Sequence, residues 1–151
     1  MSAMMWGRGP VSEELSVFPG YLLARLGEAA RRRFHDALAP EGLHPRHFGV
    51  MTVVAAHPGL TQQQLHEKTA IDTSSMVAVL DELEAKGLAE RRPYPGDRRA
   101  RTIFLTPLGE QTLARVRGLA GELQRELFQR LTAEERSTLI LLLRKLAGSA
   151  L

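Results

Sequence analysis

Six cationic side chains lie close together between residues 86 and 101, namely Lys86, Arg91, Arg92, Arg98, Arg99 and Arg101. Only Glu90 and Asp97 oppose them there, so this stretch carries a net charge of +4, against +3 for the whole protein. Charge concentrated in this way repels itself, and a bound polyanion relieves the repulsion by releasing its counterions. The stretch therefore predicts a nucleic-acid-binding surface, with a solvated charged turn as the alternative interpretation.

The cations lie on a predicted hairpin. Two β-rich runs, Leu88 to Tyr94 and Arg101 to Leu105, flank the turn-forming Pro95-Gly96-Asp97. Proline and glycine together are typical of a tight turn between two strands. The pattern predicts that the basic residues are displayed on the strands and around the tip.

A pair of helices precedes this hairpin. Thr61 and Gln64 fit a capping box that opens a helix reaching about Thr69. The next helix begins at Asp72 or Thr73 and ends at Gly87, with one apolar face. That face comprises Met76, Val79, Leu80 and Leu83. Residues 61 to 86 therefore predict a helix-turn-helix whose second helix enters the major groove.

Long helices flank this unit on both sides. Apolar periodicity predicts a first helix from Val17 to Leu38 and a second from Pro45 to His57. Another helix starts at Pro107, and a last one follows a capping box at Thr132. The last helix is apolar on most sides, which favours burial between two copies of the chain; an intramolecular bundle is the alternative.

The order of these motifs resembles the multiple antibiotic resistance regulator (MarR) family of bacterial transcription factors. The resemblance spans about residues 15 to 148. It rests on Leu83-Glu84-Ala85-Lys86-Gly87-Leu88 followed by Arg91-Arg92, then on Asp97-Arg98-Arg99-Ala100, and finally on Leu105-Thr106-Pro107-Leu108-Gly109.

The resemblance implies a mainly α fold with a small β-hairpin wing and a short third strand at Leu60. It implies a flexible tail at residues 1–14 and one domain at 15–151, with the winged helix-turn-helix at about 45–106. Dimerisation helices are expected at about 15–39 and 107–148. The implied function is a ligand-responsive repressor that binds a pseudo-palindromic operator as a homodimer. A winged-helix module that binds an acidic protein is the alternative.

The DNA-contacting residues follow from these positions. Arg99 is expected in the minor groove, with Asp97 orienting its guanidinium. Relatives often carry a long polar or basic side chain near Val77 and Ala78, so readout here is expected to depend more on groove shape. The full expected set is Thr61, Gln62, Gln63, Thr73, Ser74, Ser75, Val77, Ala78, Arg98, Arg99 and Arg101.

The resemblance also implies a pocket for a small aromatic or phenolic anion. Residues of suitable type are Tyr21 and Arg25 on the first helix and His47 and Met51 on the second. Each pair is one helical turn apart and therefore shares a face. The alternative is that Arg25 forms a surface ion pair and Met51 belongs to the core.

Other functions lack their signals. The chain has no cysteine, which excludes disulfides and thiol chemistry. Its histidines show no helical metal-binding spacing, and no cofactor loop or catalytic motif is present, so we expect neither a metal site, a cofactor nor an enzyme. No apolar run approaches 20 residues, which favours a cytoplasmic protein without membrane contact.

Overall fold

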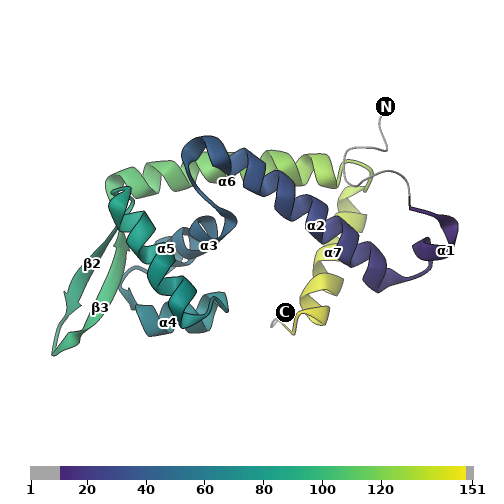
Figure 1. The fold of residues 1–151 in the computed structure, drawn as a ribbon. Helices are drawn as coiled ribbons and strands as arrows, with labels where there is room; N and C mark the ends of the chain where they lie inside the picture. The colour runs from purple at the N-terminus through teal and green to yellow at the C-terminus, as the bar shows by residue number, and fades with distance from the viewer. Residues whose placement is uncertain (1–10, 149–151) are drawn as a thin grey trace. The chain divides into compact units, whose positions relative to one another are not determined.

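The structure is a computed structural model that describes residues 11–148, apart from the side chain of Arg98. Its elements are, in order, α1 (Glu13–Ser16), α2 (Pro19–Leu38), a 3-10 turn (Ala39–Glu41), α3 (Pro45–Ala56), β1 (Leu60–Thr61), α4 (Gln62–Thr69), α5 (Thr73–Ala85), β2 (Ala89–Tyr94), β3 (Asp97–Leu105), α6 (Pro107–Leu127) and α7 (Ala133–Leu146). The predicted mainly α fold with a small β wing is confirmed (Figure 1).

The chain divides into two compact units. One comprises residues 31–119, and we call it the winged unit. The other comprises residues 1–30 and 120–151, and we call it the terminal unit. Helices α2 and α6 each contribute residues to both units. Each unit is described by itself below.

Three helices and a small sheet form most of the winged unit. The sheet is antiparallel with the order β1-β3-β2, and Ile103 in the central strand pairs with Leu60 on one side and Arg91 on the other. Helix α5 packs against α3, α4 and β2. Strands β2 and β3 project from these helices as a two-stranded wing (Figure 1). The short third strand expected at Leu60 is confirmed.

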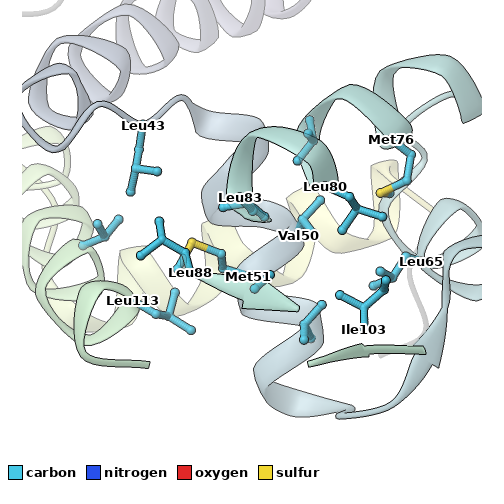
Figure 2. Close-up of a cluster of buried hydrophobic side chains, with 14 of the residues drawn as sticks. Leu43, Val50, Met51, Leu65, Met76, Leu80, Leu83, Leu88, Ile103 and Leu113 are labelled. Carbon is cyan, nitrogen blue, oxygen red and sulfur yellow. The ribbon is translucent and has the colours of Figure 1, made fainter. Parts of the chain in front are cut away.

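The core of the winged unit explains the apolar pattern of α5. Met76, Val79, Leu80 and Leu83 are all buried, as the sequence predicted. They join side chains from α3, α4 and the sheet in one hydrophobic cluster (Figure 2). Burial of each such side chain contributes about 1.5–3 kcal/mol, so this face determines which residues of α5 remain outside.

The capping residues predicted from the sequence are found at the helix ends. Asp72 accepts a hydrogen bond from the backbone N–H of Ser75 (2.9 Å) at the start of α5. Gly87 follows the helix with a φ of 68°, a left-handed conformation that glycine adopts without strain. The capping boxes at Thr61 and Thr132 are both present.

Two boundaries differ from the predictions. The first long helix begins at Pro19 rather than Val17, because proline favours the first helical position, and a short separate helix precedes it. Residues 1–10 of the expected tail lie outside the described residues, and the expected boundary at residue 14 falls within that short helix.

The hairpin tip is also tighter than predicted. Asp97 pairs with Tyr94, so the turn consists of Pro95 and Gly96 alone, and the φ of Gly96 is 92°.

The terminal unit leaves much apolar surface uncovered. None of the residues of α7 is buried, and Leu142 and Leu146 are 54% and 74% exposed. Other large exposed apolar side chains in this unit are Leu15, Val17, Phe18, Tyr21, Leu23, Leu26, Ile140, Leu141 and Leu143. So many exposed large apolar side chains in one small unit are typical of an interface rather than of a solvated surface.

A close backbone contact joins α6 to the wing. The backbone N–H of Thr106 donates to the carbonyl oxygen of Leu88 (3.1 Å), and the Thr106 hydroxyl accepts from the backbone N–H of Gly109 (3.0 Å). A Cβ atom at Gly109 would lie 1.9 Å from that same Leu88 oxygen. Only glycine therefore permits this approach.

We expect Gly109→Ala to lower the free energy of unfolding by about 1–3 kcal/mol, because the added methyl group must displace backbone. Gly118→Ala in the same helix is the matched control, since nothing lies within 4 Å of its Cβ position. This control should be neutral or stabilising by about 0.5–1 kcal/mol. Urea denaturation at one fixed protein concentration measures both changes. Equal midpoints for the two variants would contradict the role of Gly109.

Candidate nucleic-acid interface

The helix-turn-helix holds α5 with its first turns facing outward. Helix α4 ends at Ala70, which has a left-handed φ of 53°, uncommon for a residue other than glycine. The turn then leads to the Asp72 cap of α5. Of the residues expected to contact DNA, Thr73, Ser74, Val77 and Ala78 are exposed and Ser75 is half-buried; on the preceding helix Gln63 is exposed, while Thr61 and Gln62 are half-buried.

The exposed face of α5 is neutral to acidic. It offers hydroxyl and methyl groups from Thr73, Ser74, Val77 and Ala78, and its later turns carry the exposed carboxylates Asp81 and Glu82. The helix contains no lysine or arginine. Hydroxyl and methyl groups can contact base edges and thymine methyl groups, but they do not provide a bidentate guanine contact.

Two arginines of the wing are engaged within the chain. Arg91 forms ion pairs with Asp81 (2.7 Å) and Glu84 on α5, and its backbone N–H donates to Glu84 (2.9 Å). Arg92 pairs with Glu90 and lies 4.1 Å above the ring of Phe104. The Arg91 contacts fasten the base of the wing to α5, whereas the Arg92 contacts lie within the wing. They also neutralise part of the charge that the sequence assigned to the hairpin as a whole.

Further cations of the basic stretch lie on β3, toward the wing tip. Arg99 is exposed, and its backbone N–H donates to the Asp97 carboxylate (2.8 Å). Asp97 therefore holds the backbone at Arg99, rather than the guanidinium that the sequence analysis expected it to orient. Arg101 is exposed beside them, and the side chain of Arg98 lies outside the described residues.

A second feature of the winged unit is a pocket of about 500 Å³ beside α5. Its lining residues come from α2, α3, α5 and the loop before α3, and they are Arg31, His35, His44, Pro45, Arg46, His47, Ser75, Ala78, Val79 and Glu82. The rings of His35 and His44 are stacked with centroids 5.3 Å apart. Cations and imidazoles thus line one side of the pocket, and the recognition helix lines the other.

His47 links this pocket to α5. It is 1% exposed, and its Nδ1 accepts from the backbone N–H of His44 (2.9 Å), which leaves the proton of the neutral ring on Nε2. Nε2 lies 2.8 Å from a carboxylate oxygen of Glu82, although without the alignment of a hydrogen bond. Burial lowers the pKa of His47, and the attraction of Glu82 opposes that shift only in part.

The other residues expected at an effector site are placed differently. Met51 is 1% exposed within the hydrophobic core and does not line the pocket. Tyr21 and Arg25 lie in the terminal unit, where the Arg25 guanidinium donates to the Tyr21 hydroxyl (3.4 Å). Of the four residues, only His47 lines the described pocket.

The structure also brings Arg46 close to α5, and this residue is not among those predicted from the sequence. This residue follows Pro45 at the start of α3, and its guanidinium donates to the Ser75 hydroxyl on α5 (3.3 Å). A cation directly after a proline-initiated helix start was the available signal. Its contact with a helix 29 positions later depends on the fold.

Among residues 11–148, no group of three or more His, Asp or Glu side chains is arranged to hold a metal ion. No helix within that range has the length and apolar character needed to span a bilayer.

We expect the stability of the fold to decrease as the pH falls below about 6.5, the ordinary pKa of histidine, partly because of His47. The unfolded chain binds this proton more readily than the folded chain, so the contribution of neutral His47 is present above that pH and is lost below it. His47→Gln removes the titration, and its urea midpoint should fall less steeply between about pH 7 and 5. A slope equal to that of the wild type would contradict this role.

Comparison with known proteins identifies the family. The sequence profile described as MarR family matches residues 41–100. A candidate transcriptional regulatory protein for the hcr operon of Thauera aromatica is 39% identical over 128 residues, which cover 84% of this chain and 77% of that protein. The multiple antibiotic resistance protein MarR of Escherichia coli is 30% identical over 127 residues, which cover 83% and 88% of the two chains.

Solved structures agree with this assignment. The transcriptional repressor CouR, bound to a 23-mer DNA duplex, matches 92% of this chain and 99% of its own with a TM-score of 0.83 and 33% identity. The regulator BpsR of Bordetella bronchiseptica, whose DNA binding is regulated by 6-hydroxynicotinic acid, matches 94% of this chain and 100% of its own with a TM-score of 0.80 and 25% identity. The chain therefore belongs to the MarR family of transcriptional regulators.

Proposed function

We propose that this protein is a repressor that binds operator DNA as a homodimer, with the first turns of α5 in the major groove and the wing tip in the adjacent minor groove. The observation that carries the proposal is the pairing of an outward-facing α5 with an exposed Arg99 whose backbone is held by Asp97. Family membership and a relative solved with a DNA duplex support it.

Helix α5 and the wing tip contribute to DNA recognition in different ways. Helix α5 supplies hydroxyl and methyl groups, which favour modest direct readout. The tip supplies a guanidinium suited to a narrow A·T-rich minor groove, where the negative potential is enhanced. Recognition by groove shape is therefore the larger contribution to specificity in this proposal.

The dimer forms through the terminal unit. Its exposed apolar side chains on α1, α2 and α7 need a cover, and a second copy of the chain provides an identical surface. A two-fold dimer places its recognition helices about 34 Å apart, which matches half-sites about 10 base pairs apart on a pseudo-palindromic operator.

Binding of DNA responds to a small aromatic anion in this proposal. The related regulator controlled by 6-hydroxynicotinic acid supports this class of effector. The pocket that contains His47 is a candidate site, because α5 contributes Ser75, Ala78, Val79 and Glu82 to its lining. Tyr21 and Arg25 remain candidates in the terminal unit. Release of the operator on addition of aromatic acids tests this step, and unchanged DNA affinity across such a panel would contradict it.

We expect Arg99→Ala to weaken operator binding at least about tenfold, because one charge-assisted minor-groove contact is lost. The operator is first obtained by selecting DNA from a random pool with the purified protein, which also reveals its symmetry and spacing. Fluorescence anisotropy at about 0.15 M salt then gives the affinity.

Arg32→Ala is the matched control for Arg99→Ala, since Arg32 is an exposed arginine on α2 that belongs neither to the wing nor to the lining of the pocket beside α5. Its affinity should stay close to that of the wild type, and both variants should remain folded dimers. Equal affinity of Arg99→Ala and the wild type would refute the proposed role of the wing tip.

We expect the double variant Leu142→Glu, Leu146→Glu to be monomeric at concentrations where the wild type is a dimer. Each leucine contributes about 1.5–3 kcal/mol when buried, and the introduced carboxylates repel their symmetry mates. Gln129→Glu adds charge at an exposed position of the same unit without removing apolar surface, and should remain dimeric. Analytical ultracentrifugation measures the mass; a dimeric double variant would place the interface elsewhere.

A further inference from the structure

The recognition helix α5 begins with a negatively charged capping residue. Asp72 caps α5 and accepts hydrogen bonds from the backbone N–H of Ser75 (2.9 Å) and the hydroxyl of Ser74 (2.7 Å). These bonds keep the pKa of Asp72 far below its usual range, so the carboxylate is ionised at every physiological pH. Because α5 itself has no cation, only a residue from another element can offset this charge where a DNA phosphate approaches the first turn.

A guanidinium from another helix reaches the same place. Arg46 is exposed at the start of α3, and its Nη1 donates to the Ser75 hydroxyl at 3.3 Å. Its charge is also one of the influences that lower the pKa of Asp72. Arg46 therefore lies over the first turn of α5, beside the residues expected to meet the major groove.

The contact with Ser75 uses only a small part of the Arg46 side chain. A guanidinium has five N–H donors in a planar fork, and the bond to Ser75 takes one of them. The fork geometry suits two oxygens of one phosphate group. Arg46 also lies in the first turn of α3, where the positive end of the helix dipole favours an anion.

We propose that Arg46 is a DNA-contacting residue, which binds a backbone phosphate beside the major groove and thereby positions the first turn of α5. The proposal rests on the DNA-binding function proposed above and adds a second cationic contact, separate from the wing. One arginine at each end of the recognition surface would then fix the register: Arg99 at the wing tip and Arg46 at the start of α5.

A purely structural role is the competing explanation for Arg46. A single 3.3 Å bond to Ser75 from an exposed side chain contributes little to stability. Helices α3 and α5 are already held together by the buried side chains of Val50, Leu80 and Leu83. The stability of the fold therefore does not depend on Arg46. The positive charge beside Asp72, in contrast, is supplied by Arg46.

The test measures operator affinity and its salt dependence for Arg46→Ala, Arg46→Gln and Arg46→Lys. Arg46→Ala should weaken binding about tenfold and reduce the slope of log K against log salt by about 1 per half-site. Arg46→Gln keeps a donor for Ser75 but no charge, so it should lose the same slope. Arg46→Lys should restore the slope with only part of the affinity.

Ser75→Ala and thermal unfolding separate the two roles. Ser75→Ala removes the partner in the structural contact, and it should leave the salt slope unchanged; the unfolding midpoint of Arg46→Ala should match that of the wild type. A wild-type slope in Arg46→Ala and Arg46→Gln would overturn the proposal, as would an affinity loss that simply follows a lowered unfolding midpoint.

The failure of this proposal can be distinguished from failure of the proposed function. If the wild type selects and binds an operator and Arg99→Ala weakens it while Arg46→Ala does not, only the role of Arg46 is wrong. If the wild type selects no DNA, the proposed function and this inference both fail.

Discussion

The burial of one face of α5 is the constraint on which the rest of the structure depends. Met76, Val79, Leu80 and Leu83 pack into the core of the winged unit, and this packing leaves the helix no freedom to rotate about its axis. Thr73, Ser74, Val77 and Ala78 are therefore exposed as a consequence of what is buried. The same core carries α3 and the sheet, so Arg46 and the wing are placed by the same packing.

Charge is organised around that helix in two steps. Close to the core, Arg91 pairs with Asp81 and Glu84 of α5 and fixes the wing to that helix, while Arg92 pairs with Glu90 within β2. Farther out, Arg99 and Arg101 on the wing and Arg46 at α3 are exposed. Some arginines of the hairpin thus form ion pairs within the chain, and others are exposed where a polyanion could bind. Only the tertiary structure distinguishes the two groups.

The pocket beside α5 brings titratable histidines into contact with that helix. His47 is buried in neutral form between the start of α3 and Glu82 of α5, and the stacked His35 and His44 continue from it toward α2. Changes in protonation or occupancy here would act directly on α5, the helix proposed to enter the major groove. The terminal unit contributes by a different route, since its exposed apolar side chains set the conditions for pairing two copies.

The sequence by itself determined the elements. Capping residues such as Thr61, Asp72 and Thr132, the glycine after α5 and the apolar spacing of α5 are local signals, and each produced the expected boundary. Tertiary structure decided what depends on distant partners: the ion pairs of Arg91, the contact of Arg46 with Ser75 and the core position of Met51. It also decided the contact that requires Gly109 and the left-handed Ala70. Such contacts join residues far apart in the chain or impose a backbone conformation through packing, and no local propensity encodes either.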